Sequence, residues 1–369
     1  MEIIRILNKS KFLDGIYYLL SNSLLYLLRL LNSFPRNKSG NILIISFHRL
    51  GDTVFTVPAV KEIFNYYSSA NVKIITFPEC KCIYKILFDE QSIITIDTKE
   101  FKLGSRFASR NASHIVKQLK AEVIFDVTGT ITSSFLIAGS HASVIIGLNQ
   151  KYYKSLYSKF VPVRKTPDLM DRYLDVVEMV TPLINRSKLK NFPVSFSGSG
   201  RILINPFAGW KAKEWNIRKF ILLAIYLKNY YPVAFICEKS QLSGELLDEL
   251  REYNIPWIFT PTVDDLIEEI NNCSLFIGND SGPLYIAYLL GKPTFAIFGP
   301  TSADFPYIKD SYHRYIQKKL QCSPSGSQYC FTEAGLFCPA FECMNLLTID
   351  EVKMTVFSFI REIGLGESN

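Results

Sequence analysis

The stretch Gly278-Asn-Asp-Ser-Gly-Pro-Leu-Tyr285 decides the fold of the region around it. An apolar run typical of a strand, Ser274–Ile277, precedes it, and a helical pattern, Leu284–Leu290, follows it. A second apolar run, Thr294–Phe298, comes next. The order strand, glycine-bearing turn, helix, strand predicts one half of a nucleotide-binding βαβ unit.

The turn itself indicates an anion site. Parallel α/β sheets bind ligands beyond the carboxyl ends of their strands, and a helix N-terminus carries about half a positive charge. A phosphate near Ser281 and Gly282 would meet both conditions. An ordinary helix cap is the alternative interpretation of an Asn-Asp-Ser-Gly turn.

Two further stretches repeat the pattern of a strand followed by a loop suited to a ligand. The apolar run Asn41–Ser46 leads through Phe47-His-Arg-Leu-Gly-Asp52 into a helix. Arg201–Pro206 reads as a strand, and the loop Phe207-Ala-Gly-Trp-Lys-Ala-Lys213-Glu-Trp215 separates it from a helix at Ile217–Leu227. We therefore expect two Rossmann-like domains with parallel sheets that face one another across a cleft.

Length and composition agree with two domains. The chain has 369 residues, of which 48% are apolar and 20% charged, enough for two buried cores. Its net charge of +7 is modest, and it contains no zinc finger, RNP motif or basic run, which argues against nucleic acid as a partner. A basic surface suits anionic lipid or a phosphorylated sugar better.

The chain resembles glycosyltransferase family 9, the bacterial lipopolysaccharide heptosyltransferases, which have the two-domain GT-B fold. Three motifs carry the resemblance, in the family's order: Arg49-Leu-Gly-Asp52, Ala212-Lys-Glu-Trp215, and Asn279-Asp-Ser-Gly-Pro283 with its continuations Leu290-Gly-Lys-Pro293 and Ile297-Phe-Gly-Pro-Thr301. The resemblance implies an inverting transferase that moves heptose from ADP-heptose onto a lipopolysaccharide core or related lipid-linked acceptor. It implies no further cofactor and no metal, and the chain has no Asp-x-Asp motif.

The resemblance also implies a division of the chain. We expect an N-terminal extension at 1–38, an acceptor domain at 39–185 and a nucleotide-sugar donor domain at 200–348. A C-terminal helix at 349–369 would pack back on the N-terminal domain.

By family position, Asp52 is the general base that takes the proton from the acceptor hydroxyl, with Arg49 and Gly51 beside it on the acceptor side. A helix N-cap is the alternative role for Asp52. Lys213 would bind the pyrophosphate, and a solvated loop lysine is its alternative. The backbone N–H groups of four loop residues would share the leaving group's charge. These residues are Ala208, Gly209, Ser281 and Gly282.

Asp280 would hold hydroxyls of the donor sugar, or else cap the helix. Glu238 and Thr262 are candidates for the base and ribose. Five residues after the motif aspartate the family usually has histidine, and this chain has Tyr285, which cannot supply imidazole's two nitrogens. The family's histidine before the Asp171-Arg-Tyr segment is missing too. A different nucleotide sugar is therefore one alternative function, and binding without turnover is another.

The first 38 residues stand outside the family motifs. Residues 13–34 are largely apolar, but their longest unbroken apolar runs hold five residues, too few for a spanning helix. Polar residues gather on one side of the helical wheel, with Leu25 as an exception, and Pro35 would end the helix. We expect peripheral contact with the cytoplasmic face of the inner membrane. Packing on the protein itself or on a second subunit is the alternative.

The eight cysteines include a late cluster, Cys322, Cys330, Cys338 and Cys343. No signal-peptide pattern precedes the chain's core, because Asp14 comes before the apolar part and no small-residue cleavage site follows it, so we expect cytoplasmic, mostly reduced thiols. The spacing of seven, seven and four intervening residues is not that of a paired zinc ribbon. A metal site, a disulfide and free thiols all stay open.

Overall fold

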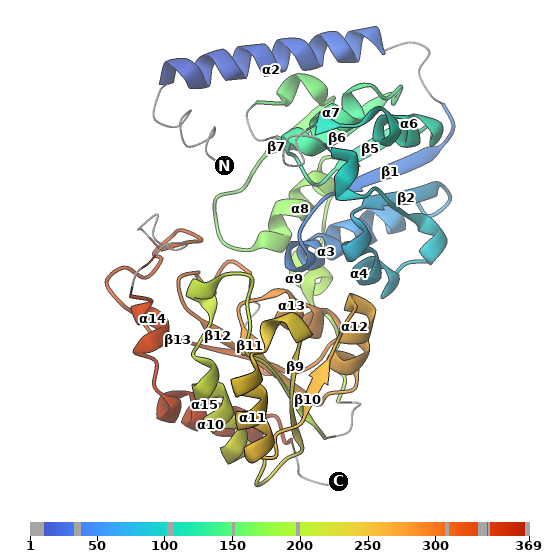
Figure 1. Cartoon of the computed structure of the whole chain (residues 1–369). Coiled ribbons are helices and arrows are strands. Elements are labelled where there is room, and N and C mark those ends of the chain that lie inside the picture. Colours follow the sequence, from blue (N-terminus) through green and yellow to red (C-terminus); the bar gives the residue numbers. More distant parts are fainter. Residues whose placement is uncertain are drawn as a thin grey trace. The chain divides into compact units, whose positions relative to one another are not determined.

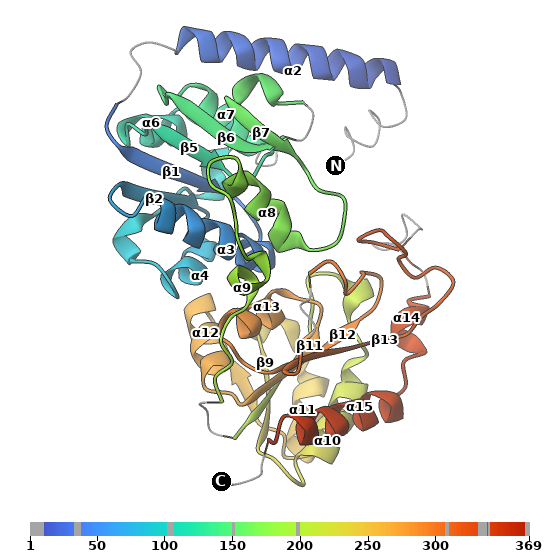
Figure 2. The same ribbon diagram turned by 180° about the vertical axis from the view of Figure 1, so that it is seen from behind.

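The computed structural model describes residues 11–32, 38–101, 107–149, 152–196, 200–306, 310–330, 338 and 340–365. The chain forms two compact units, shown from opposite sides in Figures 1 and 2. Unit 1 comprises Met1–Arg164 and Met170–Lys190, and unit 2 comprises Lys165–Leu169 and Asn191–Asn369. Each unit contains one six-stranded sheet.

The sheet of unit 1 is parallel throughout, in the order β3-β2-β1-β5-β6-β7. Its strands are β1 (Asn41–Ser46), β2 (Asn71–Thr76), β3 (Ile93–Thr95), β5 (Val123–Asp126), β6 (Val144–Asn149) and β7 (Lys159–Pro162), and the short β4 (Phe107–Ala108) lies outside the sheet. The helices are α2 (Lys11–Leu31), α3 (Leu50–Tyr66), α4 (Lys81–Lys85), α6 (Arg110–Gln118), α7 (Ile131–Ala138), α8 (Leu169–Glu178) and α9 (Arg186–Lys190). Every residue of β1 after Asn41 is buried, as expected of a central strand covered on both faces.

The sheet of unit 2 is also parallel, in the order β10-β9-β8-β11-β12-β13. Its strands are β8 (Ile202–Asn205), β9 (Val233–Cys237), β10 (Trp257–Phe259), β11 (Leu275–Asn279), β12 (Thr294–Phe298) and β13 (His313–Gln317). The helices are α10 (Ile217–Leu227), α11 (Gly244–Glu252), α12 (Val263–Asn271), α13 (Gly282–Leu289), α14 (Glu342–Asn345) and α15 (Ile349–Glu362). The predicted strands at 41–46 and 294–298 and the predicted helix at 217–227 are confirmed at those residues.

Both sheets reverse their order of growth at one place. In unit 1 the chain runs outward from β1 through β2 to β3 and then returns to β5 on the other side of β1. In unit 2 the same reversal separates β8 from β11. The loops that follow the two strands of such a pair diverge to opposite faces of the sheet and leave a crevice between them. Two Rossmann-like sheets of this kind confirm the predicted fold class.

The C-terminal helix corrects one expectation. We expected residues 349–369 to pack on the N-terminal domain. Instead, Val352, Val356 and Phe359 of α15 are fully buried in the hydrophobic core of unit 2. Helix α15 lies beside α10 and β13, as both side views show. Its apolar stripe covers a sheet face that would otherwise be open to water, and this burial stabilises unit 2 itself.

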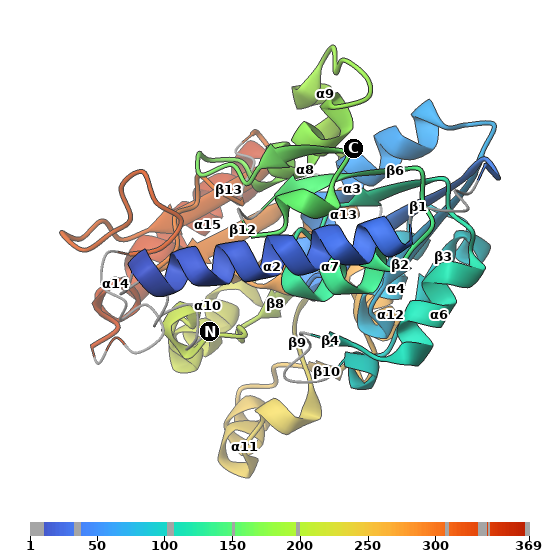
Figure 3. The ribbon, with the colours of Figure 1, turned by 90° about the horizontal axis from the view of Figure 1, so that it is seen from above.

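Helix α2 packs on unit 1 through its polar side. It runs along α7, as Figure 3 shows from above. Ser21 Oγ donates to the Tyr152 carbonyl at 2.8 Å, and Asn22 Oδ1 accepts from the Ser155 amide at 3.0 Å. Further along the helix, Arg29 donates to the Ser140 carbonyl at 3.2 Å. Leu25, which lies between Asn22 and Arg29 in sequence, is fully buried in the hydrophobic core of unit 1. The predicted amphipathic helix is confirmed, whereas its predicted end at Pro35 lies outside the described residues.

Gly291 provides a test of how the motif Leu290-Gly-Lys-Pro293 serves the fold. Its φ of +68° is one that side-chain-bearing residues rarely adopt, and an added Cβ would lie 2.1 Å from the Pro193 carbonyl oxygen. We expect Gly291→Ala to lower the free energy of unfolding by about 2 kcal/mol or more, measured by urea unfolding. Gly244→Ala is the control, because Gly244 has no atom within 4 Å of such a Cβ and an ordinary φ. Equal stability of the two variants would contradict this assignment.

Candidate functional site

The candidate residues of unit 2 lie at its switch point, at the carboxyl ends of β8 and β11. Lys213 is the last residue of the short 3-10 helix η5 (Lys211–Lys213) in the loop after β8, and Asp280 directly follows β11. Lys213 Nζ lies 2.6 Å from Asp280 Oδ2. The solvated-lysine alternative is therefore wrong, because Lys213 is paired and its side chain is only 21% exposed.

Asp280 is held by three donors. Besides Lys213, Thr301 Oγ1 donates to Oδ2 at 2.6 Å, and the Tyr285 hydroxyl donates to Oδ1 in a short hydrogen bond. The carboxylate is 4% exposed, so its charge is balanced inside the protein by the lysine and not by water. A carboxylate has about four acceptor positions, which leaves room for one further donor such as a ligand hydroxyl.

Tyr285 thus has a role that the sequence did not indicate. We expected it to stand where the family places a sugar-facing histidine. Its side chain is buried, and its hydroxyl fixes Asp280. Thr301, at the end of the strand–turn motif Ile297-Phe-Gly-Pro-Thr301, shares this role and was not among the predicted site residues. Both residues position Asp280, and through it Lys213.

Asn279 joins the two loops of the switch point. Its fully buried side chain accepts from the Trp215 amide at 3.1 Å and donates to the Pro206 carbonyl at 2.7 Å. One amide group thereby ties both ends of the loop after β8 to the end of β11. Both contacts of the Asn279 side chain go to backbone groups, so they fix the path of the loop after β8.

The N-terminus of α13 carries an unsatisfied polar group. Ser281 stands at the N-cap position with extended backbone, yet its side chain makes no capping hydrogen bond. Its Oγ is buried and has no hydrogen-bond partner among the described residues. The cap alternative for this turn is therefore not fulfilled by Ser281. A buried donor at the positive end of a helix suits an anionic oxygen.

The remaining donor-side candidates differ in their surroundings. The Ala208 amide donates to Glu214 Oε1 at 3.3 Å. The space beside Gly209 is open, because an added Cβ there would meet no atom within 4 Å. Glu238, at the end of β9, and Thr262, after β10, each form a local capping box with the residue three positions on. Neither contacts the Lys213–Asp280 pair, so the structure does not bring them to that group.

The candidate residues of unit 1 lie at its own switch point, after β1. Arg49 occupies the N-cap position of α3, and Gly51 and Asp52 belong to the first turn of that helix. The alternative role of Asp52 as the N-cap is therefore wrong. Asp52 is exposed and makes no hydrogen bond or ion pair with the described residues. A carboxylate in this position is stabilised by the helix dipole and keeps its oxygens available.

Two groups beside Asp52, the partly buried His48 and the buried Tyr173, were not among the predicted site residues. Burial lowers the pKa of His48, against the opposing effect of Asp52, and His48 Nε2 is buried with no hydrogen-bond partner among the described residues. Burial also raises the pKa of Tyr173 well above its usual value, and Asp52 adds to that rise. The two rings meet edge to face with centroids 5.2 Å apart. Their sequence signals were the position of His48 just before the Arg-Leu-Gly-Asp motif and that of Tyr173 in Asp171-Arg-Tyr.

Comparisons with known proteins identify relatives of the chain. The family model described as glycosyltransferase family 9 (heptosyltransferase) matches residues 112–334, more than half of the chain. Lipooligosaccharide heptosyltransferase 2 of Campylobacter jejuni is 26% identical over an alignment of 295 residues, and the alignment covers 76% of this chain and 88% of that protein.

Two solved structures show the same fold. The glycosyltransferase family 9 protein of Veillonella parvula has a TM-score of 0.73 at 16% identity, covering 87% of this chain and 97% of its own. The E. coli heptosyltransferase WaaC, solved with ADP-2-deoxy-2-fluoro heptose, has a TM-score of 0.62 at 12% identity, covering 86% and 99%.

Lys213 gives the sharpest test of the anion site. We expect Lys213→Met to weaken the binding of a nucleoside diphosphate about a hundredfold, because one charge-directed donor contributes about 3 kcal/mol. Isothermal titration calorimetry measures this loss. The control is Lys211→Met in the same turn, since the Lys211 side chain is 79% exposed and pairs only with Glu214. Equal affinities for the two variants would remove Lys213 from the site.

Proposed function

Because the chain belongs to glycosyltransferase family 9, the heptosyltransferases, we propose that it transfers a heptose from ADP-heptose onto a lipopolysaccharide core or a related lipid-linked saccharide. The observation that carries the proposal is the group at the switch point of unit 2. It combines a buried ion pair, Lys213–Asp280, with the unsatisfied hydroxyl of Ser281 at a helix N-terminus. A cation and a helix start side by side suit a diphosphate.

The donor reaction needs charge stabilisation. As the bond between the sugar and the diphosphate breaks, negative charge grows on the bridging phosphate oxygen. We assign its stabilisation to Lys213, to Ser281 Oγ and to the backbone N–H groups at the start of α13, without a metal. Because Tyr285 and Thr301 fix Asp280, the lysine is held in place before the substrate arrives, and little reorganisation is needed at the moment of transfer.

The acceptor reaction needs a base. Asp52 is an exposed carboxylate that has no hydrogen-bond or ion-pair partner among the described residues, and it lies in the first turn of α3 at the switch point of unit 1. We assign to it the proton of the attacking hydroxyl, with inversion at the anomeric carbon. His48 is close enough to Asp52 to interact with it, and burial lowers the pKa of His48, which disfavours a competing positive charge there.

The donor sugar has a second candidate. Tyr285 stands where the family usually has histidine and is committed to Asp280, so the contacts to the sugar must differ from the family's pattern. This observation favours a hexose or amino sugar attached to another nucleotide as the alternative donor. Binding without turnover is a weaker alternative, because the charged groups that transfer requires are all present.

A donor panel decides between these functions. We expect release of ADP from ADP-heptose in the presence of lipopolysaccharide acceptor, and no comparable release of UDP or GDP from hexose donors.

Asp52→Asn should lower the transfer rate by about a thousandfold and leave ADP affinity unchanged, since a positioned base contributes about 10²–10⁴ in rate. Glu62→Gln, in the same helix, is the matched control. Hexose transfer would establish the second candidate, and strong turnover by Asp52→Asn would exclude Asp52 as the base.

Helix α2 supports a place for this reaction at the membrane. With its polar side packed on unit 1, the helix presents a row of large apolar side chains to solvent, among them Leu20 at 66% exposure and Leu31 at 70%. The row consists of Ile16, Leu19, Leu20, Leu24, Tyr26, Leu27, Leu30 and Leu31. Each such side chain that leaves water contributes on the order of 1 kcal/mol or more. Within the described ranges, no helix is both long and apolar enough to cross a bilayer.

The net charge of residues 1–38 indicates what the apolar row of α2 would contact. Residues 1–38 contain six basic residues and two acidic ones. An apolar row on a helix within a segment of net positive charge suits the surface of an anionic membrane, where each lysine or arginine near the surface adds about 1 kcal/mol. We therefore propose peripheral contact with the cytoplasmic face of the inner membrane. A second copy of the chain would gain nothing from this charge.

Two leucines test the membrane contact. We expect Leu20→Ser with Leu27→Ser to reduce sedimentation with phosphatidylglycerol vesicles by at least tenfold, with an unchanged melting temperature, because both side chains are more than half exposed. The control pair is Leu87→Ser with Leu222→Ser, which are exposed leucines outside α2. If the wild-type chain instead ignores vesicles and forms a dimer that the α2 pair abolishes, the face is an interface between copies.

A further inference from the structure

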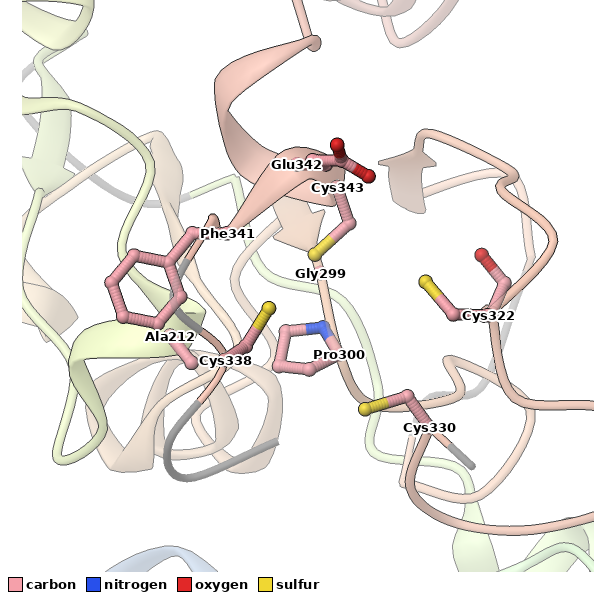
Figure 4. Close-up of a pocket in the computed structure, with 10 residues that line it drawn as sticks. Ala212, Gly299, Pro300, Cys322, Cys330, Cys338, Phe341, Glu342 and Cys343 are labelled. Carbon is pink, nitrogen blue, oxygen red and sulfur yellow. The ribbon is translucent and has the colours of Figure 1, made fainter. Parts of the chain in front are cut away.

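Four cysteines of unit 2 line one small pocket of about 40 Å³, drawn in Figure 4. Cys322, Cys330 and Cys338 come from the segment after β13, and Cys343 comes from the first turn of α14. The pocket wall between them is formed by Gly299, Pro300, Ala212 and Phe341. In Figure 4 the four sulfur atoms surround the space beside Pro300. The other four cysteines are buried elsewhere in the two units.

The four sulfur atoms are close enough to interact electrostatically. The pKa of the Cys343 thiol is raised to about 11, mainly by burial and in smaller part by the neighbouring Cys322, Cys338 and Cys330. Four thiols around one space therefore repel one another as thiolates. A bound cation reverses this effect, because it stabilises every thiolate at once.

The segment that carries the cysteines has few other supports. Between Gln317 and Glu342 the described residues form no helix or strand, and connections longer than about 12–15 residues without such structure are uncommon in compact domains. Backbone hydrogen bonds fasten the middle of the segment to the end of β12. The Cys330 amide donates to the Pro300 carbonyl at 2.9 Å, and the Ser302 amide donates to the Gln328 carbonyl at 3.0 Å. An ion bound by all four cysteines would link this segment to the first turn of α14.

We propose that these four cysteines bind a single zinc or iron ion as a four-thiolate site. Four sulfur ligands in a tetrahedron select zinc or iron among the common metals. As the side chains stand, no three His, Cys, Asp or Glu residues among those described are grouped closely enough to hold an ion. The thiols must therefore turn inward as they lose their protons to the solvent and bind. The site is structural, since all four positions around the ion are taken by protein.

The pocket borders the two segments that carry Lys213 and Thr301. Ala212, which lines the pocket, directly precedes Lys213, and Gly299 and Pro300 directly precede Thr301. An ion in the pocket would therefore brace both segments. We therefore expect loss of the ion to lower the stability of unit 2 and, secondarily, the affinity for a nucleoside diphosphate. The metal content itself does not depend on which sugar the enzyme transfers.

Metal analysis of the full chain tests the proposal. We expect one equivalent of zinc or iron per chain by plasma mass spectrometry after purification with a reductant. Cys322→Ser and Cys343→Ser should each lower this content at least tenfold, whereas Cys237→Ser, outside the pocket, should keep it. Less than a tenth of an equivalent in folded wild-type protein, or equal content in all three variants, would overturn the site.

A second measurement does not depend on the variants folding. The wild-type chain, stripped with a chelator under reducing conditions, is titrated with Co²⁺. We expect saturation at one equivalent, the visible absorption of tetrahedral thiolate coordination and a higher melting temperature. Absence of that spectrum would overturn the proposal. So would intact-mass evidence of two disulfides joining these cysteines in the protein as purified from the cytoplasm.

Discussion

Both units depend on one constraint, the burial of a parallel sheet on both of its faces. Such a sheet leaves polar side chains room only at its edges and ends, and in a parallel sheet all carboxyl ends lie along one edge. The chain reverses its order of growth once in each sheet, next to β1 and next to β8. Every charged residue assigned a part in transfer follows one of the strands at these two reversals. The position of the chemistry is thus a consequence of strand order.

Within unit 2 this general position becomes a defined geometry through a few buried polar contacts. Asn279 fixes the backbone of the loop after β8, and Asp280 fixes the charge on that loop by pairing with Lys213. A buried ion pair costs much in desolvation unless its remaining hydrogen-bonding capacity is met. Tyr285 and Thr301 meet it for Asp280. Tyr285, which stands where the family usually has histidine, therefore holds Asp280 in place, and it lacks the two nitrogens of an imidazole.

Helix α2 reverses the usual relation between polarity and burial. A surface helix normally turns its apolar stripe to the core, but here Ser21, Asn22 and Arg29 face unit 1 through hydrogen bonds to backbone groups. Those backbone groups would otherwise need water, so a polar helix face can cover them at little cost. The apolar stripe of α2 is therefore left exposed to solvent.

The sequence by itself determined the elements and their chemistry. Short, mainly apolar runs bounded by turn residues, such as Thr294–Phe298, indicate buried strands, and the loops after them carry the polar residues. These signals depend only on neighbours along the chain. Tertiary structure alone decided which side of α2 faces protein, why Leu25 breaks the polar side, and that α15 covers unit 2. It also decided that Tyr285 holds Asp280 and that four cysteines share one pocket. These outcomes depend on contacts between residues far apart in sequence, where the free energy of packing selects among patterns that are locally equivalent.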